Sequence, residues 1–301
     1  MTGTKVVKIN LEGTGVPGSL PDLRLSGPSA EEVINACGGM EEIHTAKYDS
    51  MLEKTAGFDV NSHQLQRIVD VACGMCEDDD AMNRVGLLLT ALVQNSKSNE
   101  FTITPPKLLD HIGSRLDGGK KIVINGDAGH FAGDEMIEGI VHIKGNTLNM
   151  AGQGMEGGRL IVDGSTGDEL GEYMLGGEIH VKGNAGKNTC EKMSGGIITI
   201  DRNVGANAGW LMKGGSIHVK GDAIEGVGAC MEGGSIKVGG NTGDNAGWEM
   251  EGGTLHIKGN AGDNVGLRMT GGKIRVNGRI RSISENYAGG EIWEGRTQVK
   301  P

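Results

Sequence analysis

The one short motif with an evident chemical use is Cys73-Gly-Met-Cys76. Two thiolates at this spacing can chelate a metal ion or cycle as a disulfide. A structural zinc or an iron–sulfur cluster needs four ligands, and only Cys37, His44 and His63 lie near the motif in sequence. Because the motif closes a predicted helix, it also lacks the strand-first setting of a thioredoxin-like site. We therefore predict two idle or buried thiols, with a metal or redox site at Cys73 and Cys76 as the alternative.

A second motif, Gly152-Gln-Gly154-Met-Glu-Gly157, has the spacing of a dinucleotide-binding loop. That loop opens a helix, whereas this segment joins one group of glycines to the next. We interpret it as a coincidence in a chain with 55 glycines among 301 residues. The sequence holds no phosphate-binding P-loop, no G-x-S-x-G and no H-E-x-x-H. We therefore predict no catalytic residues in this chain.

A repeat of nineteen residues dominates the chain from about Gly119 to Gly290. A glycine pair follows nearly every repeat methionine, then an alternating segment such as Leu160-Ile161-Val162, then a glycine ladder with the spacing G-x2-G-x3-G. The methionines keep the interval without a slip: Met136, Met155, Met174, Met193, Met212, Met231, Met250 and Met269. Self-similarity at a fixed period is typical of solenoids, in which one unit cannot bury its apolar side alone.

The repeat predicts a mainly β fold, a single-stranded parallel β-helix of about nine coils over residues 116–301. Methionine and the apolar residues five and seven positions after it are expected to point inward and to stack from coil to coil. The flexible thioether suits gaps beside glycine, which fits an aromatic content of only 3%. Leucine-rich repeats and hexapeptide helices are disfavoured, because Leu and Asn are too sparse and the spacing within a coil is uneven. Crossover chirality favours a right-handed helix.

The outward positions of the predicted coils carry charges and histidines. Opposite charges alternate eight residues after successive methionines, which predicts ion pairs between adjacent coils at Lys144, Asp163, Lys182, Asp201 and Lys220. Histidines recur on every second coil, at His142, His180, His218 and His256. At a separation of roughly 9.6 Å they are too far apart to share a metal ion. We interpret them as surface residues retained when the repeat was duplicated.

Two tryptophans stand at equivalent positions of coils that are two apart. Trp210 and Trp248 each precede their coil's methionine by two residues. The chain has only 3 Trp, 3 Tyr and 3 Phe, so this recurrence in register is notable. Trp is enriched where proteins bind one another. We predict structural packing for both tryptophans, with a small apolar docking spot for a partner as the alternative.

Residues 1–115 lack the repeat and are predicted to form a mostly helical cap or partner-binding region. A helix is expected from Ser29 to Cys37, because Ser29 and Glu32 have the spacing of a capping box. Apolar residues at helical intervals predict two more helices, over 61–73 and 81–94. The segment 101–104 reads as a strand that leads into the solenoid. An open β-helix end exposes unpaired strand edges, which a cap would cover.

Composition restricts the class of partner. The net charge is −10 and the pI is about 5.3, which argues against nucleic acid and anionic membranes as partners. No run of eighteen apolar residues is present, and the five cysteines fit a reducing compartment better than a disulfide framework. We therefore expect a cytoplasmic protein with no membrane association.

The glycine ladder that follows M-x-G-G-x-(I/V)-x-V resembles the GXGXG β-helix family over about 170 residues. That family includes the β-helix subunit of formylmethanofuran dehydrogenase and the C-terminal domain of the glutamate synthase large subunit. The segment Gly167-Asp-Glu-Leu-Gly171-Glu-Tyr-Met174-Leu-Gly-Gly177 is most similar to the formylmethanofuran dehydrogenase type. The N-terminal region departs from the typical protein of that type, since its helices and Cys73/Cys76 have no counterpart there.

The resemblance implies a non-catalytic scaffold subunit of an oxidoreductase complex in methanogenesis or one-carbon metabolism. It implies other protein subunits as partners and no cofactor in this chain, while partner subunits would carry a tungsten or molybdenum pterin, iron–sulfur clusters or zinc. Two alternatives stay open. One is a glutamate synthase-like β-helix protein that supports amidotransfer partners, and the other is a stand-alone archaeal paralogue with a metal or redox site at Cys73 and Cys76.

Overall fold

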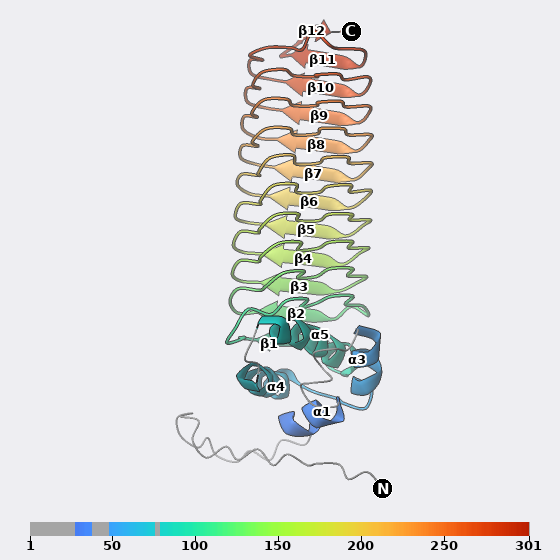
Figure 1. The fold of residues 1–301 in the computed structure, drawn as a ribbon, viewed down its shortest axis with the longest axis vertical. Helices are drawn as coiled ribbons and strands as arrows, with labels where there is room; N and C mark the ends of the chain where they lie inside the picture. Colours follow the sequence, from blue (N-terminus) through green and yellow to red (C-terminus); the bar gives the residue numbers. More distant parts are fainter. Residues whose placement is uncertain (1–27, 38–47, 76–78, 301) are drawn as a thin grey trace.

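The computed structural model describes residues 28–37, 48–75 and 79–300 and shows a long solenoid with helices packed at one end (Figure 1). Twelve strands form one sheet whose spatial order follows the sequence order. The predicted class is thus confirmed, a mainly β parallel β-helix with N-terminal helices. The strands are β1 (Glu100–Ile103), β2 (Lys121–Ile124), β3 (Ile140–Ile143), β4 (Arg159–Val162), β5 (Glu178–Val181), β6 (Ile197–Ile200), β7 (Ser216–Val219), β8 (Ser235–Val238), β9 (Thr254–Ile257), β10 (Lys273–Val276), β11 (Glu291–Glu294) and β12 (Thr297–Lys300).

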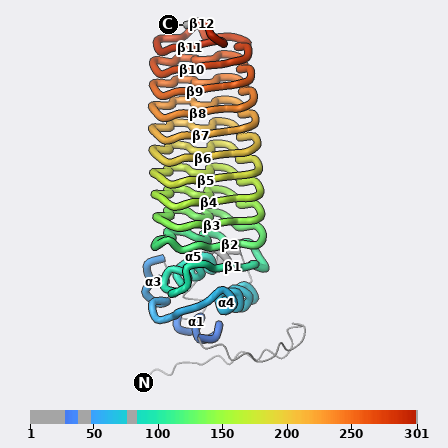
Figure 2. Tube along the Cα trace, turned by 180° about the vertical axis from the view of Figure 1, so that it is seen from behind, coloured from blue at the N-terminus to red at the C-terminus, as the bar shows by residue number. Residues whose placement is uncertain are grey.

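Strands β1 to β11 pair in parallel, each with the next along the chain, so the coils stack evenly when seen from behind (Figure 2). Paired residues in the middle of the stack are one repeat apart, as in Leu160 opposite Ile179. Between β10 and β11 the register joins Lys273 to Glu291, a shift of 291 − 273 = 18. The last parallel pair is therefore one residue shorter in register than the nineteen-residue repeat. At the other end, the sheet begins at β1.

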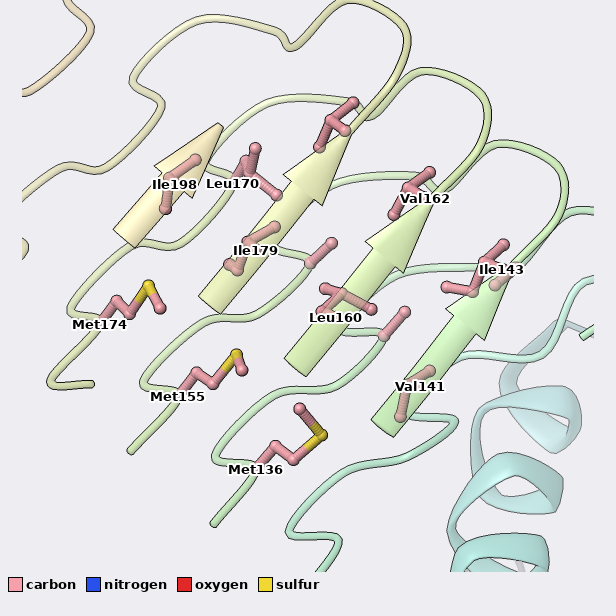
Figure 3. Close-up of a cluster of buried hydrophobic side chains, with 14 of the residues drawn as sticks. Met136, Val141, Ile143, Met155, Leu160, Val162, Leu170, Met174, Ile179 and Ile198 are labelled. Atoms are coloured by element: carbon pink, nitrogen blue, oxygen red, sulfur yellow. The ribbon is translucent and has the colours of Figure 1, made fainter. Parts of the chain in front are cut away.

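The interior consists of apolar ladders, as predicted. All eight repeat methionines are completely buried, and the residues five and seven positions after each of them are at most 2% exposed. Figure 3 shows Met136, Met155 and Met174 in one row beside the inward side chains of the strands, such as Leu160 and Val162. Each inward side chain therefore packs against its equivalents in the coils above and below.

The pairing of methionine with a glycine pair has a packing cause. In most pairs the second glycine lies against the methionine of the preceding coil. A Cβ built on Gly215 would lie 2.7 Å from Cε of Met193, and one built on Gly234 would lie 2.8 Å from Cε of Met212. Both glycines have left-handed backbones, with φ of 81° and 84°. The end of each thioether thus occupies the space that a side chain would need in the next coil.

One corner of the solenoid is held by a ladder of polar side chains. Each side chain accepts a hydrogen bond of 2.6–3.1 Å from the backbone N–H of the equivalent residue one coil later. The ladder satisfies backbone donors where the chain turns out of the sheet. Its accepting residues are Asp127, Asn146, Ser165, Asn184, Asn203, Asp222, Asn241 and Asn260.

The helices cover the N-terminal end of the solenoid. They are α1 (Ala30–Ala36), α3 (Tyr48–Thr55), α4 (Ser62–Met75) and α5 (Asp79–Asn95). The predicted capping box between Ser29 and Glu32 is present, and α4 and α5 match the two other predicted helices. Buried side chains of α5 share one apolar cluster with the first coils. None of the described helices is long and apolar enough to cross a membrane.

Helix α4 covers the open edge of β1 with side chains in place of a further strand. The amide of Gln66 donates to the carbonyl oxygen of Thr104 at 3.0 Å and accepts from the Thr104 N–H at 2.7 Å. One turn earlier, the Ser62 hydroxyl accepts from the Thr102 N–H at 3.2 Å. Ser62 and Gln66 lie on one face of α4, four residues apart, and hydrogen-bond to backbone groups at the edge of β1. Without them these backbone groups would be unpaired.

Candidate functional site

The first residue of the predicted metal or redox motif, Cys73, is buried. Cys73 is 1% exposed on α4 and belongs to the same apolar cluster as Cys37, which caps α1. Burial raises the pKa of the Cys37 thiol, although the positive charge of Lys54 opposes that shift. Cys76 lies outside the described residues, so the metal or redox site stays a prediction. Among the described residues, no three His, Cys, Asp or Glu side chains are grouped as a metal ion would require.

The two predicted tryptophans lie on the corner of the solenoid that contains the repeat methionines. Trp248 is 37% exposed and Trp210 is half-buried. The coil between them has Ala229 at the equivalent position, and Ala229 is buried. Their backbone carbonyls accept from the N–H groups of neighbouring coils, Lys192 for Trp210 and Cys230 for Trp248. The positions are therefore fixed by the coil stacking, while the outer ring surfaces remain accessible.

Cys230 lies between the two tryptophan coils. Its thiol is half-buried and donates to Oε2 of Glu249 at 3.8 Å. Burial raises the pKa of Cys230, a hydrogen bond from Trp210 opposes the rise, and the charge of Glu249 adds to it. The thiol form therefore predominates at neutral pH, which disfavours a nucleophilic role.

Large apolar side chains continue along this corner beyond the tryptophans. Leu175 is 58% exposed, Tyr173 is 46% exposed and Ile137 is 44% exposed. The ammonium of Lys192 lies over the Tyr173 ring, 4.8 Å from its centroid, and donates to the Tyr173 hydroxyl at 3.0 Å. We call the set the corner ridge: Ile137, Tyr173, Leu175, Trp210 and Trp248.

The outer face of the sheet carries repeated triplets of His, Asp and Lys. His142 Nε2 lies 3.1 Å from Oδ1 of Asp163, and Lys182 Nζ lies 2.8 Å from the same oxygen. Two coils later, His180, Asp201 and Lys220 repeat the arrangement at 3.1 and 2.7 Å. The predicted pairing of opposite charges between adjacent coils is confirmed for Asp163 with Lys182 and for Asp201 with Lys220. The histidine contacts were not predicted, although their offset of 21 residues, one coil plus two, is readable in the sequence.

These contacts keep the aspartates charged. Burial alone would raise the pKa of Asp163, but hydrogen bonds from Lys182 and His142 hold it below its ordinary value. The hydrogen bond from Lys220, with a smaller one from His180, also lowers the pKa of Asp201 against the effect of burial. Each aspartate is therefore an anion at neutral pH that bridges a histidine and a lysine from flanking coils.

A Ser–His–Asp cluster joins the first coils and was not predicted. The Ser114 hydroxyl donates to Oδ1 of Asp134, and His111 Nδ1 lies 3.4 Å from that carboxylate oxygen and 3.5 Å from the Ser114 oxygen. In a hydrolytic triad the acid and the serine contact opposite ring nitrogens, whereas here both contact Nδ1. Ser114 is 2% exposed, and the His111 ring stacks on Phe131. The cluster therefore has the geometry of a structural junction.

An open depression of about 370 Å³ lies at the polar corner, next to β6 and β7. Asn184, Asn203 and Asp222 form one side of it, and Ile224 projects beside it with 59% of its surface exposed. Most coils have glycine at the position of Ile224. The repeat thus departs from its own pattern here.

The fold is a parallel β-solenoid with a helical cap, and its outer surface carries exposed apolar side chains on one corner and charged triplets on the sheet. No protein-family model matches the chain, and a search of curated proteins finds no similar protein.

Proposed function

We propose that this chain is a non-catalytic scaffold protein of a multisubunit enzyme, similar to the β-helix subunit of formylmethanofuran dehydrogenase. The corner ridge is the observation that carries this proposal. It exposes Leu175, Tyr173 and Trp248 on a molecule whose interior ladders are already closed by packing within the chain. Large apolar side chains that are exposed repeatedly along one corner are typical of a surface that another protein covers.

The ridge is suited to binding because it is rigid. Each of its residues flanks a buried methionine, and the coil above and the coil below fix the backbone by hydrogen bonds. Tryptophan and tyrosine on such a fixed backbone lose little conformational freedom on binding, which is why they dominate protein interfaces. About ten coils at roughly 4.8 Å each give a rod of order 48 Å, long enough to hold two subunits at a set distance.

In this proposal the chemistry belongs to the partners. By resemblance, they would carry a tungsten or molybdenum pterin, iron–sulfur clusters or zinc, and the assembly would act in one-carbon metabolism. The solenoid would contribute side walls for docking, and the helices α1, α3, α4 and α5 would cover one end of it and present a second surface.

The test is affinity purification of the tagged chain from native cells, followed by identification of the proteins that remain bound in stoichiometric amount. We expect other enzyme subunits in the wild type and at least a tenfold loss in a Trp210→Ser/Trp248→Ser variant. Ile197→Ser is the matched control, because Ile197 is 48% exposed on the strand face, away from the ridge. Recovery of this chain alone at every salt concentration would overturn the proposal.

The alternative is a metal or redox protein in which Cys73 and Cys76 supply the thiolates. Elemental analysis of the purified protein separates the two functions. Stoichiometric zinc or iron that is lost in Cys73→Ser would favour the metal site and count against a purely structural role.

A further inference from the structure

The triplets on the outer face of the sheet follow a period of two coils, and the third repeat lacks its acid. His218 and Lys258 stand where His180 and Lys220 stand one period earlier. Between them, at the position of Asp163 and Asp201, the chain has Gly239. The backbone stacking is conserved in spite of this change. The N–H of Gly239 donates to Val219 at 2.8 Å, as the N–H of Asp201 donates to Val181 at 2.9 Å.

The loss of the acid coincides with a gain of cations on the same face. The outward residues of β3 to β6, with the residue after each strand, include Lys144, Arg159, Lys182, Asp163, Glu178 and Asp201, a sum of 3 − 3 = 0. The equivalent residues of β7 to β10 include Lys220, Lys237, Lys258, Lys273 and Arg275 and no acid, a sum of +5. This basic face stands out on a chain of net charge −10.

Two of the five cations are neutralised from the neighbouring strands. Lys220 pairs with Asp201 on the β6 side, and Lys273 pairs with Glu291 of β11. Within the described part of the chain, no ion pair is found for Lys237, Lys258 or Arg275. These three side chains lie on successive coils of one face, so their positive charge is available to an anion that binds there.

We propose that the face formed by His218, Lys237, Lys258 and Arg275 binds an acidic segment of a partner protein. One carboxylate of that segment takes the place of the missing aspartate, between the imidazole of His218 and the ammonium of Lys258. The complete triplet shows that a single carboxylate oxygen reaches both groups, because Asp201 Oδ1 lies 3.1 Å from His180 and 2.7 Å from Lys220.

The unpaired cations extend the site along the stacking direction. Lys237 and Arg275 lie in the same column as His218, one and three coils further on. Further carboxylates of an extended segment would meet them at multiples of roughly 4.8 Å. This inference deepens the scaffold proposal by naming the chemistry of one partner, and it concerns a different side of the solenoid from the corner ridge.

The test uses the purified full chain and a fluorescently labelled hexaglutamate peptide, with hexaglutamine as the neutral probe. We expect hexaglutamate to bind at low salt, hexaglutamine not to bind, and a Lys237→Gln/Lys258→Gln variant to lose roughly tenfold in affinity. Lys144→Gln/Lys182→Gln is the matched control, because it removes two cations from the balanced part of the same face and should change the affinity less than twofold. Gly239→Asp is unsuitable, since a Cβ there would lie 2.2 Å from the carbonyl oxygen of Lys220.

Three results would overturn the proposal. They are no hexaglutamate binding at low salt, an equal loss in both double variants, and tighter binding of an oligothymidylate that competes for the same lysines, which would indicate a nucleic-acid surface. Melting temperatures of the variants confirm that these exposed substitutions leave the fold intact. Failure of this test would leave the purification of partner subunits unaffected, so the two proposals can fail separately.

Discussion

The contact between methionine and glycine across coils predicts that identical substitutions have opposite effects at two glycines. At Gly234, φ is 84°, and a new Cβ would lie 2.8 Å from Cε of Met212 and 2.9 Å from the Gly215 carbonyl oxygen. At Gly74, which is exposed on α4, nothing lies within 4 Å of the new Cβ. Alanine should therefore destabilise the protein at the first position and stabilise it at the second.

The magnitudes follow from the two environments. A left-handed backbone costs a residue with a side chain about 1–2 kcal/mol, and overpacking of a close-packed core costs about 1–3 kcal/mol. Gly234→Ala should thus lower the free energy of unfolding by about 3 kcal/mol. Gly74→Ala replaces glycine in a helix and should raise that free energy by about 0.5–1 kcal/mol.

Guanidinium unfolding followed by tryptophan fluorescence suits the first variant, because Trp210 and Trp248 lie in coils close to Gly234. A Met212→Ala background adds a sharper comparison. With Cε removed, the cost of Gly234→Ala should fall by about 1 kcal/mol, since the remaining penalty is the left-handed backbone and the carbonyl contact. An unchanged cost in that background would refute the packing explanation, and a neutral Gly234→Ala would refute the whole argument.

Three further outcomes are expected. Ser62→Ala/Gln66→Ala should destabilise the protein by about 1–2 kcal/mol. Hydrogen exchange of the Thr102 and Thr104 amides should become faster, because the side chains that accept from them are lost. Unchanged exchange would contradict the role of α4 at the β1 edge. Asp163→Asn/Asp201→Asn should cost about 1 kcal/mol or less at pH 7. Because their folded-state pKa values are lowered, that stabilisation is present above the unfolded value near 4 and is lost as the pH falls through the folded value, so wild type and variant should converge at the acid end of the unfolding curves. Cys230 should react with iodoacetamide more slowly than glutathione at pH 8 and faster as the pH rises, and peptide mapping that found rapid labelling at pH 7 would contradict its raised pKa.

The interior could be predicted from the sequence because the same pattern of inward residues recurs in every coil. Eight methionines in one register leave few arrangements, and all eight are buried as expected. The cap offers no such redundancy. Helix α3 was missed because its eight residues bury only Tyr48, Met51 and Thr55, a pattern too short to distinguish from chance. The bonds from Ser62 and Gln66 to β1 join residues about 40 apart and have no period that a sequence could show.

The exterior was predictable where it repeats and not where it departs from the repeat. Alternating charges predicted the pairs of Asp163 and Asp201 with lysine, since sheet neighbours lie one repeat apart. The histidine contacts needed the sheet geometry, because they run diagonally between outward positions two residues apart. The His111 cluster depends on side-chain directions in a left-handed turn, which residue types alone do not define.

Several outward residues that depart from the repeat lie in the same few coils. This clustering supports one functional region that includes all of them. Inward residues touch equivalents above and below, so they are constrained, whereas outward residues are free to change. Between β6 and β9 the chain changes on three sides at once: Trp210 and Trp248 on the methionine corner, Ile224 on the polar corner, and Gly239 on the strand face. One partner that wraps these coils would contact all three sides. Hydrogen exchange in the purified assembly should then show protection centred on β6 to β9, and protection confined to β3 to β5 would contradict a single partner that wraps these three sides.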